Sequence, residues 1–163
     1  MPRYFALIPA AGNGTRLGAE TPKQYLAVAG RSLLAHAAAT LLADSRIMKT
    51  FVVVSPEDPY AERIATMPGL EAALVLPCGC ATRAETVING LREMENHDVL
   101  DNDWVLVHDA ARPCLSAALL KRLIDEIGTD VVGGILAVPV SDTLKRGDEF
   151  HRATATEPRV GLW

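Results

Sequence analysis

The stretch that decides the fold is Tyr4-Phe5-Ala6-Leu7-Ile8-Pro9, followed at once by the loop Ala10-Ala11-Gly12-Asn13-Gly14-Thr15-Arg16-Leu17-Gly18. A short apolar run that ends in small residues is typical of a strand buried in a parallel sheet. A glycine-rich turn after such a strand presents backbone N–H groups at the carboxyl edge of the sheet, where phosphates bind without many charged side chains. These residues predict an α/β protein with an anion-binding loop after its first strand.

Strand-like and helix-like segments alternate along the rest of the chain. Apolar and β-branched runs predict further strands at Thr50–Val54, Ala72–Leu76, Trp104–Val107 and Val131–Val140. Helices are expected after the capping residue Ser32 over Leu33–Ala43, around Pro59–Thr66, over Thr82–Met94, and from Ser116 to about Ile127. This alternation predicts a mostly parallel sheet layered between helices.

The character of the chain changes over residues 141–159. Polar residues dominate there, Gly147 interrupts the run, and no periodicity suggests a face turned to a core. The segment is therefore either a disordered tail or an arm that leaves the domain to meet a partner. Because no internal repeat or linker is visible, residues 1–163 are expected to form a single domain.

The composition fits a globular protein that lacks a large basic surface. Hydrophobic residues make up 49% of the 163 residues, charged residues 22%, and the formal net charge is −4. General nucleic-acid and membrane-surface binders need an excess of cations, so we expect neither kind of partner. A nucleotide bound by this chain has to be held by a few placed basic residues instead.

Location and redox state follow from simple signals. No apolar run approaches the roughly 20 residues that a membrane span needs. The start, Met1-Pro2-Arg3-Tyr4, leads into a strand without the cleavage pattern of a signal peptide, so a cytoplasmic location is expected.

The cysteines Cys78, Cys80 and Cys114 suit neither a full disulfide set nor a zinc site of four thiolates. Reduced thiols are the expected state.

The glycine loop fails to match two common nucleotide-binding motifs. The dinucleotide fingerprint asks for Gly-x-Gly-x-x-Gly, whereas these glycines stand at positions 12, 14 and 18, with Leu17 where the third should be. No acidic residue ends a second strand about 20 residues later, because Thr50–Val54 comes much further on. A Walker A motif is excluded since no Gly-Lys-Ser/Thr follows. Nicotinamide-dependent redox chemistry is therefore disfavoured.

Two basic residues accompany the loop. Arg16 lies inside it and Lys23 follows shortly after, in Thr21-Pro22-Lys23-Gln24-Tyr25-Leu26. A guanidinium and an ammonium near one phosphate site suit phosphoryl or nucleotidyl transfer, where catalysis is mainly positioning and neutralisation of charge. A lone cation beside a turn would be read as a surface residue, but two cations around one such loop favour the catalytic interpretation.

The motifs, in their joint order, resemble the methylerythritol phosphate cytidylyltransferases of the non-mevalonate isoprenoid pathway. The resemblance extends over essentially the whole chain and implies a Rossmann-like nucleotidyltransferase fold with a protruding dimerisation arm. The matching stretches are Pro9-Ala10-Ala11-Gly12-x-Gly14-x-Arg16, Pro22-Lys23-Gln24-Tyr25, Arg83 before Val87, His108-Asp109-Ala110-Ala111-Arg112-Pro113, Pro139-Val140-x-Asp142-Thr143-Leu144-Lys145 and Gly161-Leu162-Trp163.

This resemblance implies a reaction and a set of roles. CMP would pass from CTP to 2-C-methyl-D-erythritol 4-phosphate with the help of Mg²⁺ or another divalent cation, whose protein ligands are not assigned. Arg16 and Lys23 would stabilise the pentacoordinate α-phosphate. The residues implied in CTP binding are Ala10, Ala11, Gly12, Gly14, Gly79, Cys80, Ala81, Arg83 and Thr86.

The acceptor site follows from the same resemblance. Asp109, Arg112, Thr143 and Arg159 would contact methylerythritol phosphate, with Arg159 reaching the 4-phosphate from a neighbouring subunit of a homodimer. A plainer interpretation of Asp109 and Arg112 is a salt bridge across a turn. His108 is interpreted as structural.

The chain also departs from the family pattern. Cys80 replaces a glycine in the nucleotide-base segment, and Ala81 often has a polar counterpart there. A positive φ at Cys80 would strain its backbone. The family continues for dozens of residues after Gly-Leu-Trp, so this chain is expected to lack a C-terminal part. The open alternatives are a ribitol 5-phosphate cytidylyltransferase, another sugar-phosphate nucleotidyltransferase, and an inactive nucleotide-binding fragment.

Overall fold

The protein is described here from a computed structural model, which covers residues 3–12, 21–128 and 130–163. These residues form two compact units, Met1–Leu120 and Lys121–Trp163. None of the helices in the described ranges is both long enough and apolar enough to span a bilayer.

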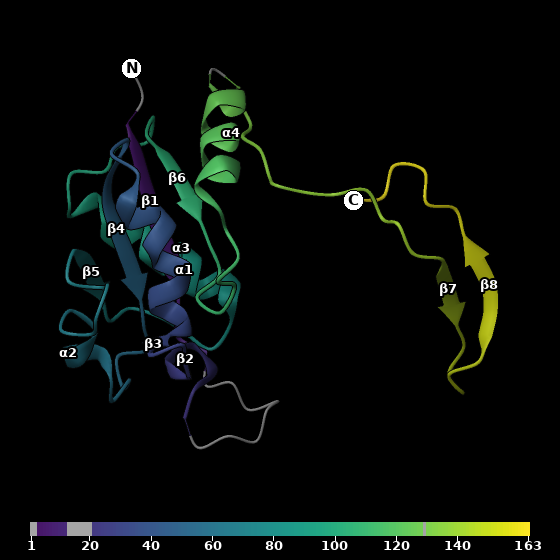
Figure 1. Ribbon diagram of the computed structural model, residues 1–163, viewed down its shortest axis with the longest axis horizontal. Coiled ribbons are helices and arrows are strands. Elements are labelled where there is room, and N and C mark those ends of the chain that lie inside the picture. The colour runs from purple at the N-terminus through teal and green to yellow at the C-terminus, as the bar shows by residue number, and fades with distance from the viewer. Residues whose placement is uncertain (1–2, 13–20, 129) are drawn as a thin grey trace. The chain divides into compact units, whose positions relative to one another are not determined.

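A four-stranded parallel sheet forms the centre of the first unit (Figure 1). Its strands are β1 (Tyr4–Pro9), β4 (Ile47–Val53), β5 (Ala73–Leu76) and β6 (Trp104–Val107). They lie in the order β5-β4-β1-β6, and every neighbouring pair is parallel. The predicted α/β class and parallel sheet are confirmed.

The four expected α-helices form, and a 3-10 helix that was not predicted precedes them. They are the 3-10 helix η2 (Lys23–Tyr25) and the α-helices α1 (Leu33–Ala43), α2 (Ala61–Ile64), α3 (Arg83–Glu95) and α4 (Ala117–Ile127), the last of which crosses the boundary between the units. A short hairpin, β2 (Ala27–Val28) with β3 (Arg31–Ser32), precedes α1. Local capping sets the helix starts: the Ser32 hydroxyl accepts a hydrogen bond from the Ala35 N–H at 3.1 Å.

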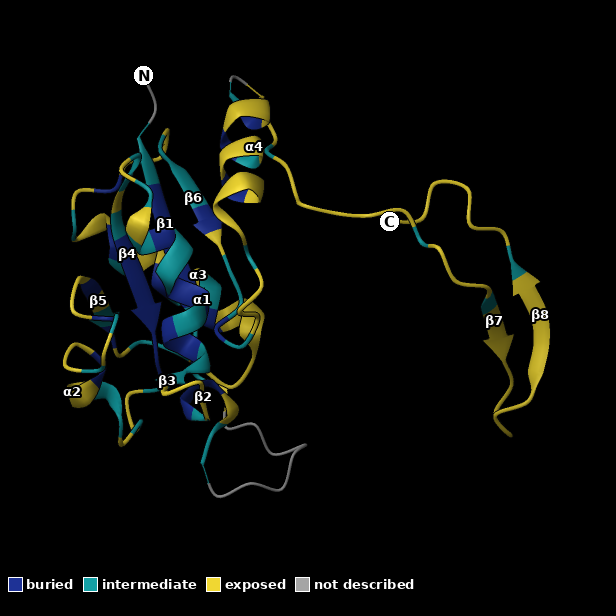
Figure 2. Ribbon diagram, in the orientation of Figure 1, coloured by how far each residue is buried: buried dark blue, intermediate teal, exposed yellow. Residues whose placement is uncertain are grey.

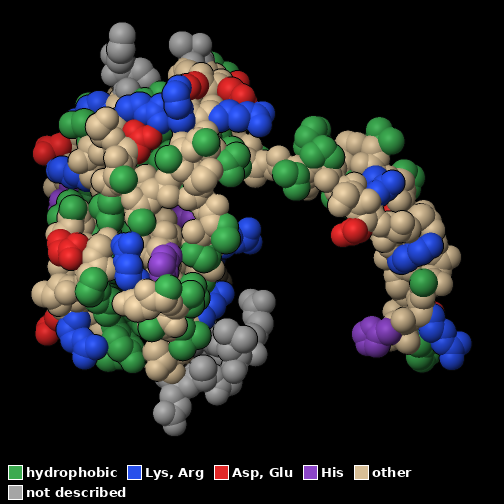
Figure 3. All heavy atoms as spheres, viewed as in Figure 1, with side chains coloured by type: hydrophobic (Ala, Val, Ile, Leu, Met, Phe, Trp, Pro, Cys, Tyr) green, Lys and Arg blue, Asp and Glu red, His purple; other side chains and the backbone are tan. Residues whose placement is uncertain are grey.

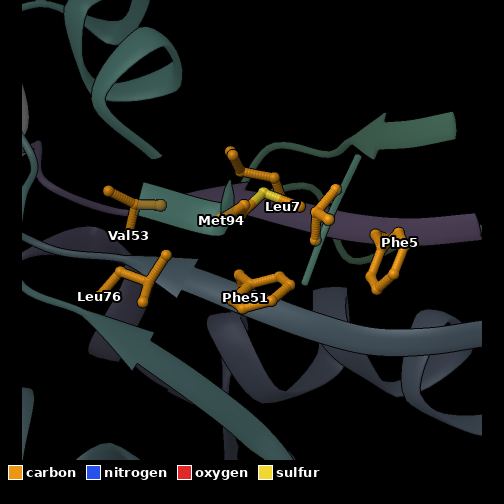
Figure 4. Packing of buried hydrophobic residues seen from close by; sticks show 7 residues of the cluster. Phe5, Leu7, Phe51, Val53, Leu76 and Met94 are labelled. Atoms are coloured by element: carbon orange, nitrogen blue, oxygen red, sulfur yellow. The ribbon is translucent and has the colours of Figure 1, made fainter. Parts of the chain in front are cut away.

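The buried core lies on both faces of the sheet, where alternate residues of each strand point in opposite directions. On one face, side chains from β1, β4 and β5 meet those of α3 and the turn after it (Figure 4): Phe5, Leu7, Phe51, Val53, Leu76, Met94 and Val99. The intervening residues of the central strands are also fully buried, as the dark strands in Figure 2 show. Burial on both faces explains why Tyr4–Pro9 reads as an unbroken apolar run.

Gly90 lets α3 lie close to the sheet. A Cβ added there would stand 2.7 Å from Val53 Cγ2 and 2.8 Å from Leu7 Cδ1. In an open helix position, Gly→Ala stabilises by about 1 kcal/mol. Here the extra methyl would overpack the core at a cost of about 1–3 kcal/mol. We therefore expect Gly90→Ala to lower the free energy of unfolding in a urea titration.

The matched background for that experiment is Val53→Ala, which opens space under the added methyl. The double variant Gly90→Ala/Val53→Ala is expected to be more stable than the sum of the two single effects, because the pair is in contact. Strict additivity, or a stabilising Gly90→Ala on its own, would contradict the close-packing explanation.

In the second unit, the strand predicted at Val131–Val140 does not form, so that prediction is wrong. Several of its apolar side chains are almost fully exposed, among them Val131 at 97% and Val132 at 90%. A strand needs a neighbour for its N–H and C=O groups, and no described strand pairs with this segment. Figure 3 shows hydrophobic side chains standing along the chain that leads to the hairpin.

The segment predicted to be either a tail or an arm contains an antiparallel hairpin. Its strands are β7 (Leu144–Gly147) and β8 (Ala153–Glu157), paired from Leu144 opposite Glu157. An Arg146–Glu157 ion pair joins the two strands. The hairpin is polar and largely exposed, which fits the absence of a core-facing pattern in the sequence.

Candidate active site

Four loops meet at the carboxyl edge of the sheet. The chain leaves β1 for β4 and β5 on one side, then crosses to β6 on the other side of β1. The strand order therefore reverses beside β1, and in open α/β sheets such a reversal creates a crevice that binds ligands. The glycine loop after β1 starts at this point.

A pocket of about 460 Å³ lies at this edge. Its lining combines the loops after β1, β4 and β5: Ala11, Gly12, Ser55, Pro56, Glu57, Gly79, Cys80 and Ala81. The structure thus brings together five residues predicted to bind CTP, namely Ala11, Gly12, Gly79, Cys80 and Ala81. Sequence reasoning missed the wall at 55–57. The available signal was its position directly after a predicted strand, which places it at the same edge.

The loops are tied to the sheet by backbone hydrogen bonds. The Ala10 N–H donates to the Val53 carbonyl at 2.7 Å, and the Gly79 N–H donates to the Val54 carbonyl, also at 2.7 Å. Gly79 lies so close to its neighbours that an added Cβ would stand 2.4 Å from Ala11 Cβ and 2.7 Å from the Val54 oxygen. A glycine is required here by the approach of two backbones.

Thr86 holds the Cys80 loop, which lines the pocket, through two hydrogen bonds. Its side chain is buried, its Oγ1 accepts from the Cys80 N–H at 3.0 Å, and its hydroxyl donates to the Cys80 carbonyl at 3.2 Å. Positive φ among described non-glycine residues occurs only at Ala29, Asp98 and His151. Cys80 therefore replaces the family glycine without backbone strain.

The same loop leads into a well-capped helix. The Thr82 hydroxyl accepts from the Glu85 N–H, while the Glu85 carboxylate accepts from the Thr82 N–H at 3.1 Å. The side-chain hydrogen bond from Thr82 also lowers the pKa of Glu85. All three cysteines are free thiols, and burial raises the pKa of Cys78.

Of the two predicted catalytic cations, the structure places one. Lys23 is exposed at the start of η2, directly before Gln24, whose buried amide contacts the glycine loop. Arg16 lies outside the described residues, as does Gly14 of the predicted CTP-binding set.

Asp109, which follows β6, lies between the side chains of Arg83 and Arg112. Arg83 Nε donates to Asp109 Oδ1 at 2.8 Å, and Arg112 Nε lies 2.8 Å from Asp109 Oδ2. The plainer interpretation, an Asp109–Arg112 salt bridge, is thus present, but it belongs to a three-residue cluster with a surplus positive charge. The arginine side chains are 60% and 78% exposed, so the cluster is open to an anionic ligand.

The remaining predicted site residues, Thr143 and Arg159, belong to the second unit. Arg159 Nη1 donates to the backbone carbonyls of Ser141 and Asp142 and so closes the open end of the hairpin. Thr143 is exposed and precedes β7.

Residues 4–163 match the family model described as IspD: 2-C-methyl-D-erythritol 4-phosphate cytidylyltransferase. The chain belongs to this family. Among curated members, the 2-C-methyl-D-erythritol 4-phosphate cytidylyltransferase of Nitrosospira multiformis is 54% identical over 164 residues, which cover 100% of this chain and 71% of that protein. The namesake from Dechloromonas aromatica is 55% identical over 163 residues, with the same coverage.

Solved structures of IspD proteins are similar over the same length. The crystal structure of a 4-diphosphocytidyl-2C-methyl-D-erythritol synthase superposes with a TM-score of 0.87 at 41% identity, covering 100% of this chain and 71% of that one. The Francisella tularensis IspD structure gives a TM-score of 0.71 at 28% identity, covering 99% and 68%. The IspD nucleotidyltransferase fold expected from the motifs is confirmed.

Proposed function

We propose that this IspD-family chain transfers CMP from CTP to 2-C-methyl-D-erythritol 4-phosphate. The products are 4-diphosphocytidyl-2-C-methyl-D-erythritol and pyrophosphate. The observation that carries the proposal is the pocket at the carboxyl edge, lined by Ala11 and Gly12 on one side and by residues 79–81 on the other. These are the positions that the family motifs assign to the nucleotide.

The chemistry requires little from the protein beyond placement and charge. An oxygen of the acceptor's 4-phosphate forms a bond to the α-phosphorus of CTP, and the bond from that phosphorus to pyrophosphate breaks. Because the attacking phosphate is already ionised at neutral pH, no protein general base is needed. The ammonium of Lys23 and the guanidinium of Arg16 counter the negative charge that builds on the α-phosphate oxygens.

The two walls of the pocket suit the two parts of the nucleotide. Residues 10–12 begin the loop that would face the phosphates with backbone N–H groups. Residues 79–81 and Arg83 would surround the cytidine, and Thr86 would fix the wall at Cys80.

Magnesium fits this arrangement. Mg²⁺ usually takes its ligands from phosphate oxygens, waters and one or two carboxylates, so it needs no preformed protein cluster. The described residues contain no group of three or more His, Cys, Asp or Glu side chains that could hold a metal. When bound, the ion would neutralise charge on the departing pyrophosphate.

The acceptor is assigned to Asp109 and Arg112 of the cluster after β6. The family motifs assign Thr143 and Arg159 of the second unit to the acceptor as well. The surplus positive charge of the cluster suits a phosphorylated polyol, and the Asp109 carboxylate can accept from hydroxyl groups. As the family motifs imply for Arg159, we propose that it serves the site of a second subunit and that the chain works as a homodimer.

The test is pyrophosphate release from CTP and Mg²⁺, measured with methylerythritol 4-phosphate, with ribitol 5-phosphate, and with no acceptor. Release only with methylerythritol phosphate is expected. Release only with ribitol phosphate would keep the reaction and change the acceptor. Absence of release with either acceptor, in protein that binds CTP in calorimetry, would identify the chain as a nucleotide-binding fragment and overturn the proposal.

A further inference from the structure

We propose that Gln24 and Tyr25 are positioning residues, which hold the Lys23 backbone in a fixed relation to the pocket walls at 10–12 and 55–57. Lys23 itself is exposed, and a long exposed side chain has many rotamers. Its usefulness in a transfer reaction depends on where its backbone is anchored. The inference rests on the proposed function only for its effect on turnover.

Gln24 anchors the turn to the glycine loop. Its side chain is 3% exposed, and Nε2 donates to the Ala10 carbonyl at 2.8 Å and to the Gly12 carbonyl at 3.0 Å. A side-chain amide has two N–H donors, and both are used. In a trans peptide the N–H points opposite to the C=O, so holding the Ala10 carbonyl turns the Ala11 N–H away from Gln24. The clamp thus fixes the direction of a backbone donor in the pocket wall.

Tyr25 anchors the same turn to the pocket wall at 55–57. Its hydroxyl donates to Asp58 Oδ2 at 2.8 Å, and its ring stacks on Tyr60 with centroids 4.4 Å apart. Burial raises the pKa of Tyr25, and the hydrogen bond to Asp58 acts in the same direction, so the hydroxyl keeps its proton. The Asp58 N–H donates to the Ser55 carbonyl at 3.0 Å. Tyr25 is therefore linked to the segment that lines the pocket at 55–57.

The turn itself leaves Lys23 little freedom. The Tyr25 N–H donates to the Pro22 carbonyl at 2.9 Å, and the Leu26 N–H donates to the Lys23 carbonyl at 3.2 Å. A shift of the Lys23 backbone would have to break the contacts of Gln24, of Tyr25, or of both. Two walls that come from distant parts of the sequence are thus coupled to the catalytic cation through one short 3-10 helix.

A purely structural role would make a different prediction. If Gln24 only contributed to folding stability, its loss would lower the melting temperature and leave the folded protein unchanged in the pocket. If it positions the loop, its loss would free Ala11 and Gly12 locally and reduce turnover in protein that is still folded. These outcomes are separable by experiment.

The primary experiment is Gln24→Met, which keeps the side-chain length and removes both donors. We expect the ¹⁵N order parameters of the Ala11 and Gly12 amides to fall from about 0.85 to below about 0.6. Those of Ala6 and Leu7 in β1 should stay unchanged. The matched control is Asn96→Leu, which removes an exposed amide that donates to Glu93. Unchanged order parameters at Ala11 and Gly12 would overturn the inference, whether or not the chain turns over CTP.

The second readout connects the clamp to Lys23. Gln24→Met is expected to reduce kcat about 10- to 100-fold in the otherwise unchanged chain, since small displacements of catalytic groups carry losses of this size. In a Lys23→Ala background the same change should reduce kcat less than about threefold, because the group it positions is gone. Tyr25→Phe, which removes only the bond to Asp58, should show the same dependence on background. Equal effects in both backgrounds would reject positioning of Lys23.

Discussion

Replacing Lys23 with alanine is expected to slow CTP turnover about 100- to 1,000-fold, the usual cost of losing one charge-stabilising group in a transition state. CTP affinity should change less than about tenfold, because the negative charge that the ammonium faces is largest when the α-phosphate becomes pentacoordinate. The measurement is kcat from pyrophosphate release, together with the CTP dissociation constant from calorimetry.

The matched control is Lys49→Ala. Lys49 lies near the amino end of β4, away from the carboxyl edge, and its Nζ donates to the His97 carbonyl at 3.1 Å. Lys49→Ala should leave kcat within about twofold, since a remote cation contributes little to the reacting atoms. A parallel loss of affinity and turnover in Lys23→Ala would assign Lys23 to simple CTP binding.

The same variant tests the exchanged arm. Arg159→Ala should weaken binding of the acceptor and leave CTP binding unchanged. If each site takes Arg159 from the other subunit, mixing the Lys23→Ala and Arg159→Ala proteins should restore activity, because mixed dimers contain one intact site. No restoration after subunit exchange would count against the arm model.

The second large effect is expected from Gly79→Ala. The new methyl would stand 2.4 Å from Ala11 Cβ and 2.7 Å from the Val54 carbonyl oxygen, and neither atom belongs to a flexible side chain. The two pocket walls must therefore separate. We expect CTP affinity to fall more than about tenfold, or about 1.4 kcal/mol, and the free energy of unfolding to fall by about 1–3 kcal/mol.

Gly12→Ala is the control for stability. No described atom lies within 4 Å of a Cβ added at Gly12, and its φ is not among the positive values. Its free energy of unfolding should stay within about 0.5 kcal/mol of the parent. If urea titrations show equal stability for the two variants, crowding at Gly79 is not the reason for the glycine.

Much of the fold could be predicted because its signals are local. The Ser32 cap involves residues only three positions apart in the chain. The unbroken apolar run in Tyr4–Pro9 follows from burial of the strand on both faces. The glycine-rich turn after the first strand placed the loop at 10–12 at the carboxyl edge of the sheet, and the structure places residues 79–81 beside it. The family motifs assigned these loops to CTP.

Other features depend on which distant residues the fold brings together. The Arg83–Asp109 pair spans 26 residues, and no spacing rule in the sequence predicts it. Gln24 reads as an ordinary polar residue until its amide is found between the Ala10 and Gly12 carbonyls. Val131–Val140 has the composition of a strand but no paired neighbour among the described residues. Composition and capping act within a few residues, so the sequence alone determined the α-helices, the central strands and the chemistry of the loops. Strand pairing, the crowding at Gly79 and the anchoring of Lys23 need partners from elsewhere in the chain, and only the tertiary structure decided them.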